Sequence, residues 1–175
     1  MVVSVGTDRH PFDRLVGWAE RWAERVPEWD VEIQYGHSRA PVAGRAVTRH
    51  DHDRLAELLS EAELVVCDGG PLLVATARRF GHRPIVVPRD AARGEHADSR
   101  QQVFARRLAR AGVAELAETE DAFLAALVAA AFLPRPRPAL DDVEDGDIPH
   151  AVFRVGEIVE ELAARRRGSA SPRRG

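Results

Sequence analysis

Apolar residues along the chain fall into short continuous runs that alternate with longer stretches of helical spacing. The first run stops at Gly6 and Thr7, which predicts a buried strand followed by a loop. Apolar positions then recur at helical spacing until Pro27, which ends the predicted helix. The elements expected in this first third are strands at 1–5, 31–36 and 46–47 and a helix at 12–26.

The middle of the chain repeats this alternation of strands and helices. Asp51 or Asp53 can cap the next helix, and Gly112 is the expected stop of a later one. The elements expected here are helices at 51–62, 71–80, 101–111 and 120–132 and strands at 64–67 and 84–87. The buried face of the helix at 101–111 is predicted to consist of Val103, Phe104, Leu108 and Ala111. Strands that alternate with helices predict a Rossmann-like, doubly wound α/β fold with a mostly parallel sheet.

The pattern changes after residue 133, so residues 1–133 are interpreted as the folded, ligand-binding domain. Residues 134–150 combine a run of prolines and arginines with an acidic stretch, a composition typical of a linker. Residues 151–166 recover helical spacing and predict an appended C-terminal helix, which would fold back on the domain or dock on another chain. Residues 167–175 are expected to be a disordered Arg-rich tail, a reading favoured over contact with anionic lipid headgroups.

Composition narrows the class of protein further. The 175 residues fit one domain with an appendage, and a hydrophobic content of 45% is enough for a core. A net charge of −3 argues against a broad nucleic-acid-binding surface. The single cysteine, Cys67, cannot form an internal disulfide, so a reducing compartment is expected. No apolar run reaches the ~18 residues of a spanning helix and no signal pattern is present, which predicts a cytoplasmic location.

Two predicted strands in the centre of the chain each end in a loop that leads into a helix. Such loops gather at the carboxyl edge of a parallel sheet, where ligands bind. Gly69 and Gly70 precede a helix that begins at Pro71, and glycines allow a ligand to approach the backbone closely. The free N–H groups of the helix start suit a phosphate group. This arrangement predicts a nucleotide-type pocket.

Three features near this pocket have alternative interpretations. Asp68 is interpreted as a helix cap in preference to a catalytic base. His50 and His52 are interpreted as surface residues in preference to metal ligands, and no metal site is expected. Trp18 and Trp29 would mark a partner surface if they proved to be exposed.

Five blocks of sequence carry a resemblance to a known family. They are Val3–Val16, Ile33–Ser38, Ala62–Cys67 with Gly69–Pro71, Pro84–Arg89, and Gly94–Asp98 with Gln101. In this order and spacing they resemble the glycosyltransferase family 28 C-terminal domain over roughly residues 2–132. Within that family the chain is most similar to free-standing members, namely exopolysaccharide subunits of the PssE type and the small subunit of the dolichol-linked N-acetylglucosamine transferase.

The resemblance implies half of a two-part enzyme. Its fold would be the C-terminal half of a GT-B glycosyltransferase, which holds a nucleotide-diphosphate sugar, with a UDP-sugar favoured, and uses no metal or other cofactor. The chain would be the donor-binding subunit of an inverting transferase in polysaccharide or lipid-linked glycan synthesis. It would be active only with a membrane-associated acceptor-half subunit, which would place it at the inner face of the membrane. A homodimer of the isolated chain is left open.

The resemblance also assigns residues to the site. No catalytic residue is assigned: the general base is expected on the partner, and His10 is a weak candidate for acting on the acceptor. The positions implied to bind the nucleotide sugar are Gly6, Thr7, His52, Gly69, Gly70, Pro71, Leu72, Arg89, Glu95, His96, Gln101 and Gln102.

The central loop departs from the family pattern. Asp68 stands where the family usually has histidine, Leu72-Leu73 replace a glycine and a hydroxyl residue, and Thr76 takes a usually acidic position. A carboxylate at residue 68 would repel a diphosphate unless the helix dipole, Arg89 or Arg93 offsets its charge. These departures favour an alternative function, that of a non-catalytic family member acting as a protein-interaction module.

Overall fold

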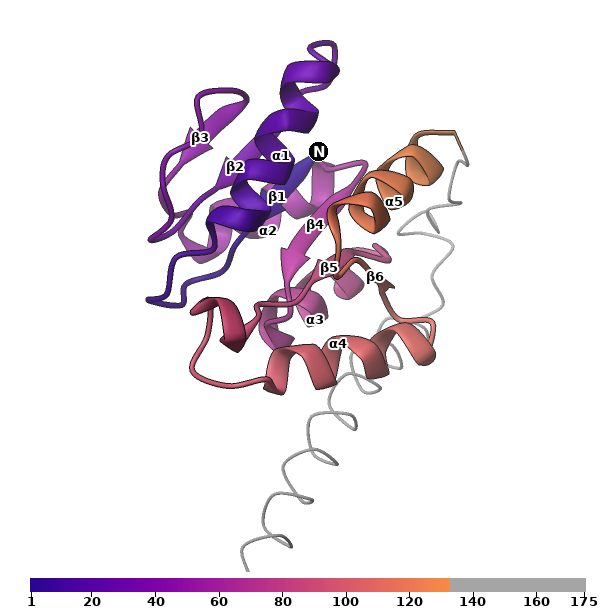
Figure 1. Cartoon of the computed structure of the whole chain (residues 1–175). Coiled ribbons are helices and arrows are strands. Elements are labelled where there is room, and N and C mark those ends of the chain that lie inside the picture. Colours follow the sequence, from indigo (N-terminus) through magenta and orange to yellow (C-terminus); the bar gives the residue numbers. More distant parts are fainter. Residues whose placement is uncertain (133–175) are drawn as a thin grey trace, which may run out of the picture.

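Six strands form one sheet in the computed structural model, which describes residues 1–132 (Figure 1). Across the sheet they lie in the order β3 (Arg45–Val47), β2 (Glu32–Gln34), β1 (Val2–Ser4), β4 (Val65–Asp68), β5 (Ile85–Val87) and β6 (Glu115–Leu116). All neighbouring pairs are parallel, which confirms the predicted Rossmann-like α/β fold. The linker, helix and tail predicted at 134–175 lie outside the described residues.

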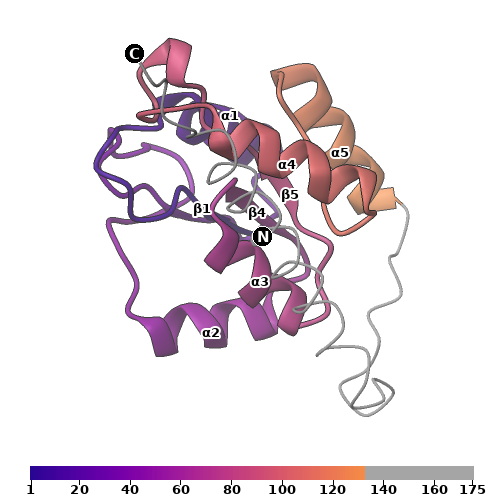
Figure 2. The same ribbon diagram turned by 90° about the horizontal axis from the view of Figure 1, so that it is seen from below.

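Helices cover both faces of the sheet, as Figure 2 shows from a second direction. On one face lie α1 (Asp13–Arg25) and α5 (Glu120–Phe132), and on the other lie α2 (His52–Glu61), α3 (Pro71–Arg79) and α4 (Arg100–Arg110). Each set of helices closes its own apolar cluster against the sheet. The central strands β1, β4 and β5 are therefore buried from both sides, which is why they appear in the sequence as short apolar runs.

Alternate residues of the central strands point into the two clusters. Val3 and Val66 pack under α1 and α5, whereas Val2 and Val65 pack under α2, α3 and α4. Cys67 faces the second cluster and is fully buried, and this burial raises the pKa of its thiol well above the ordinary value. The thiol therefore stays uncharged and serves as a small apolar side chain.

The structure differs from the sequence-based prediction in several details. The two-residue strand β6 and a 3-10 turn at Ala91–Arg93 were not predicted. Val103 was placed on the buried face of its helix but is 43% exposed, because Phe104 and Leu108 are the side chains of α4 that reach the core. Asp51 does cap α2, where its carboxylate accepts the N–H of Arg54 at 2.8 Å.

The tryptophans belong to the core. Trp18 is only 6% exposed, and its ring centroid lies 5.7 Å from that of Phe123. Trp29 is half-buried and packs edge-on against Trp22, with 5.5 Å between the ring centroids. Neither residue marks an exposed partner surface.

Candidate functional site

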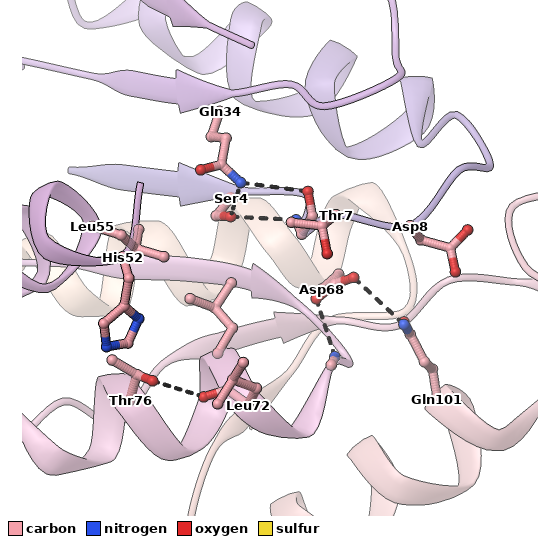
Figure 3. Close-up of a pocket in the computed structure, with 13 residues that line it drawn as sticks. Ser4, Thr7, Asp8, Gln34, His52, Leu55, Asp68, Leu72, Thr76 and Gln101 are labelled. Carbon is pink, nitrogen blue, oxygen red and sulfur yellow. Dashed lines mark hydrogen bonds between the residues drawn. The ribbon is translucent and has the colours of Figure 1, made fainter. Parts of the chain in front are cut away.

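A pocket of about 310 Å³ lies beside the carboxyl ends of β1 and β4 (Figure 3). From β1 the chain proceeds outward to β2 and β3, and from β4 it proceeds to β5 and β6 on the other side. Doubly wound sheets bind ligands at such a reversal of strand order. The topology therefore explains why the pocket is at this edge of the sheet.

The pocket lining comes from segments that are far apart in the sequence. β1 and the loop after it contribute Ser4, Gly6, Thr7 and Asp8. β4 and the start of α3 contribute Asp68, Gly70, Leu72 and Leu73. The remaining lining residues are Gln34, His52, Leu55, Thr76 and Gln101.

The Asp68 carboxylate lies in the wall of the pocket and is almost completely buried, with 4% of the residue exposed. Its Oδ2 accepts hydrogen bonds from Arg89 Nε at 3.2 Å and from Gln101 Nε2 at 3.4 Å. Its Oδ1 accepts the backbone N–H of Gly70 at 3.1 Å. Burial raises the pKa of Asp68, and the Arg89 charge and these hydrogen bonds offset that shift only in part.

The prediction that Asp68 caps a helix is wrong. The N-cap of α3 is Gly70, and no side chain caps this helix. Asp68 is instead the last residue of β4, and it accepts the N–H of the cap residue itself. Of the two arginines considered as its counter-ion, Arg89 makes the contact, whereas Arg93 pairs with Asp90 at 3.3 Å.

The glycines of the predicted phosphate cradle accommodate the protein's own side chains. A Cβ on Gly6, where φ is +74°, would lie 2.7 Å from Asp68 Oδ2, and one on Gly70 would lie 2.9 Å from Oδ1. A Cβ on Gly69 would lie 3.0 Å from the Gln101 side chain, whose Oε1 also accepts the Gly69 N–H at 3.1 Å. The N–H groups of Gly69 and Gly70 are therefore already engaged within the protein.

The helix start retains other donors. The N–H groups of Leu72 and Leu73 are in the first turn of α3, where a helix provides no internal acceptor. Both residues line the pocket, and Leu72 is 76% exposed. Because the positive end of the helix dipole adds to these N–H groups, this side of the pocket suits an anionic group.

Arg89 lies beneath the pocket and not on its surface. Its side chain is 1% exposed and donates to the backbone oxygens of Val5 at 2.6 Å, His10 at 2.7 Å and Glu95 at 3.0 Å. These acceptors belong to the loops that follow β1 and β5. Arg89 therefore ties the two loops together from below, and its predicted binding of a ligand stays a prediction.

Glu95 has a similar supporting role. Its carboxylate receives two hydrogen bonds from Arg14, each of 2.8 Å, and the backbone N–H of Asp90 at 2.8 Å. The side chain is 8% exposed and does not line the pocket. Glu95 therefore fixes the loop after β5 to α1, and its predicted contact with a ligand stays a prediction.

Asp8 brings two histidines together at the mouth of the pocket. His10 Nδ1 lies 2.6 Å from Asp8 Oδ1, and His96 Nε2 lies 3.5 Å from Asp8 Oδ2. Burial acts to raise the pKa of Asp8, but hydrogen bonds from His10 and the nearby charges of Arg89 and His96 bring it below the ordinary value. An action of His10 on an acceptor stays a prediction, as does the general base.

The predicted site residues divide into those that line the pocket and those that do not. The predicted residues that line the pocket are Gly6, Thr7, His52, Gly70, Leu72 and Gln101. The predicted residues outside the lining are Gly69, Pro71, Arg89, Glu95, His96 and Gln102. Binding of a nucleotide sugar by any of them stays a prediction.

Sequence reasoning missed Ser4 and Gln34 in the pocket wall. Gln34 Nε2 donates to Ser4 Oγ at 3.0 Å, and both residues are buried. Each is the polar last residue of a buried strand, and this position is the signal that could have identified them, because polar residues are rarely buried without a reason. His50 was interpreted as a surface residue, but its side chain is only 8% exposed and its Nε2 lies 2.7 Å from Glu32 Oε1.

Comparison with known proteins identifies one similarity. A sequence model of the glycosyltransferase family 28 C-terminal domain matches residues 19–142. A search of curated proteins gave no significant match. Within residues 1–132, no helix combines the length and the apolar character that crossing a bilayer requires.

Proposed function

The chain belongs to the glycosyltransferase family 28 C-terminal domain family, and from this premise we propose that it is the donor-binding subunit of a two-component, inverting glycosyltransferase. Its donor is a nucleotide-diphosphate sugar, with a UDP-sugar favoured. The acceptor half is a separate, membrane-associated subunit, and the product is a polysaccharide or a lipid-linked glycan.

The position of the pocket is the observation that supports this function most. It lies at the reversal of strand order between β1 and β4, with the first turn of α3 on one side. Its volume of about 310 Å³ is within the range of small-molecule sites. The N–H groups of Leu72 and Leu73 would face the diphosphate, while His52 and Leu55 from α2 line a part of the pocket suited to the base.

The reaction needs little covalent participation from this chain. An acceptor hydroxyl oxygen attacks the anomeric carbon of the sugar, and the bond from that carbon to the diphosphate oxygen breaks. The nucleoside diphosphate leaves with the electron pair, and the hydroxyl proton passes to a general base on the partner subunit. The N–H groups at the start of α3 stabilise the charge that develops on the leaving diphosphate.

A thermal-shift experiment with the full chain tests donor binding. UDP, GDP, ADP and dTDP at millimolar concentration are compared, and the expected result is a rise in melting temperature with at least one of them. Thr76→Phe places a ring in the pocket and should abolish the rise, whereas the matched Thr76→Ser should keep it. Absence of a shift with all four nucleotides would refute a working donor site.

A second candidate function rests on the engaged glycine N–H groups. Because Asp68 and Gln101 already accept the N–H groups of Gly70 and Gly69, the cradle has fewer donors for a diphosphate than its sequence suggests. This favours a non-catalytic interaction module. Co-purification separates the two functions: sugar transfer by the complex supports the donor subunit, and a partner whose binding ignores nucleotides supports the module.

A further inference from the structure

We infer that Asp68 is a specificity-determining residue of this pocket: its carboxylate competes with a diphosphate, so that a nucleoside diphosphate binds together with a proton. This inference rests on the proposed function, because it concerns the same site and the same class of ligand. Its consequence is that the pocket binds a nucleoside diphosphate more tightly in mildly acidic than in mildly alkaline solution, whereas an uncharged nucleoside shows no such preference.

The carboxylate occupies the space that a phosphate group would use. It lies between Gly6 and Gly70, so close that a Cβ on either residue would be less than 3.0 Å from one of its oxygens. It also takes the N–H of Gly70. A phosphate drawn to the neighbouring N–H groups of Leu72 and Leu73 would therefore lie beside a buried negative charge, where little water screens the repulsion.

The groups around Asp68 determine how this repulsion can be relieved. From the end of β5, Arg89 is the cation in direct contact, and its charge is fixed at any pH relevant to binding. From α4, Gln101 contributes an uncharged amide. From the loop after β1, Asp8 adds a second negative charge to the pocket wall, and the neighbouring Cys67 stays uncharged.

Protonation of Asp68 relieves the repulsion between its carboxylate and the phosphate in two ways. It removes the negative charge, which leaves the Arg89 guanidinium as an uncompensated positive charge beneath the phosphate. It also gives the carboxyl an O–H that can donate to a phosphate oxygen. Burial already raises the pKa of Asp68, and a second anion beside it would raise the pKa further, so proton uptake and diphosphate binding favour each other.

Calorimetric titration of the full chain with UDP tests the inference. At pH 5.5 and pH 8.0, in buffers of different ionisation enthalpy, the heats report both affinity and the number of protons taken up. We expect UDP to bind at least about tenfold more weakly at the higher pH, with net proton uptake at the pH where Asp68 is ionised. Uridine is the uncharged probe and should bind equally at both values.

The Asp68→Asn variant supplies the decisive comparison. The amide has the shape of the carboxyl but cannot ionise, so its UDP affinity at pH 8.0 should exceed that of the unaltered chain by at least about tenfold. The histidines near the pocket, His10, His52 and His96, would also favour anions when protonated. Asp68→Asn distinguishes them, because a contribution from histidine would persist in this variant.

The outcomes separate this inference from the proposed function. If UDP binds the unaltered chain with the same affinity at both pH values, or if Asp68→Asn keeps the pH dependence, the inference is wrong and the donor site stands. If no nucleotide binds either protein at either pH, both are wrong. Should Asp68→Asn fail to fold, proton uptake is counted in a chain with His10, His52 and His96 changed to Gln, and the probe is UDP-glucose, whose diphosphate diester does not titrate between pH 5.5 and pH 8.0, unlike the terminal phosphate of UDP. Uptake that disappears there overturns the inference, and uptake that persists supports it.

Discussion

Replacement of Arg89 by methionine should destabilise the fold severely, because this one side chain donates hydrogen bonds to four separate acceptors. Its guanidinium pairs with the buried Asp68 carboxylate and donates to the carbonyl oxygens of Val5, His10 and Glu95. Methionine fills a similar volume but offers no donor. The substitution therefore leaves one carboxylate and three carbonyl groups without their partner.

The size of the effect follows from these lost contacts. Removing one member of a buried ion pair costs about 3–5 kcal/mol. Carbonyl oxygens left without a donor add on the order of 1 kcal/mol each, less where water can reach them. Together these contributions give an expected loss of about 5–8 kcal/mol in the free energy of unfolding, which is a large part of the ~5–15 kcal/mol that stabilises a typical domain.

Urea denaturation followed by circular dichroism measures this loss. The matched control is Arg21→Met, which breaks the ion pair of 2.8 Å between Arg21 and Glu120. These two side chains are 44% and 36% exposed, so the substitution should cost at most ~1 kcal/mol. The double variant Asp68→Leu/Arg89→Met removes both buried charges and should recover part of the loss. A cost below ~1 kcal/mol for Arg89→Met would refute the role assigned to this residue.

Three further predictions concern Gly6, Asp68 and helix α4. Gly6→Ala places a methyl group 2.7 Å from Asp68 and should cost at least ~1 kcal/mol more in urea denaturation than Gly94→Ala, which has the same left-handed backbone but nothing within 4 Å. Asp68 has a raised pKa in the folded chain, so its contribution to stability is present below pH 3.8 and is lost as the pH rises through the folded pKa. The melting temperature should therefore fall over that pH range, and Asp68→Asn should remove this fall. Val103→Ala should change the free energy of unfolding by less than ~0.5 kcal/mol, whereas Leu108→Ala, on the buried face of the same helix, should cost ~2–5 kcal/mol.

Sequence pattern predicted the layers of the fold well because its strands are buried on both faces. Continuous apolar runs at 1–5, 64–67 and 84–87 all became strands, and the glycine and proline signals bounded the helices between them. β6 was missed because two residues, Glu115 and Leu116, are too few to show a period.

The site was harder to predict because its chemistry depends on pairs that are distant in the sequence. Asp68 and Arg89 were recognised as charges that could offset one another, but their burial follows only from the tertiary structure. Gln34 is brought beside Ser4 by the pairing of β1 with β2, which spacing along the chain does not reveal. The glycines were read as space for a ligand, whereas the space beside Gly6 is filled by Asp68.

The stability of the pocket loops and the proposed affinity for a diphosphate both depend on the Asp68 carboxylate. The Asp68 carboxylate accepts hydrogen bonds from Arg89 Nε and from the Gly70 N–H, so it helps to hold the loops that form the pocket. If the pocket binds a diphosphate as proposed, the same charge lies beside it and opposes its binding. Because one N–H cannot fully serve two acceptors, a ligand must either use Leu72 and Leu73 alone or displace the carboxylate from Gly70. Under the proposed function, the balance between these two routes would decide whether the chain works as a donor subunit or only keeps the fold of one.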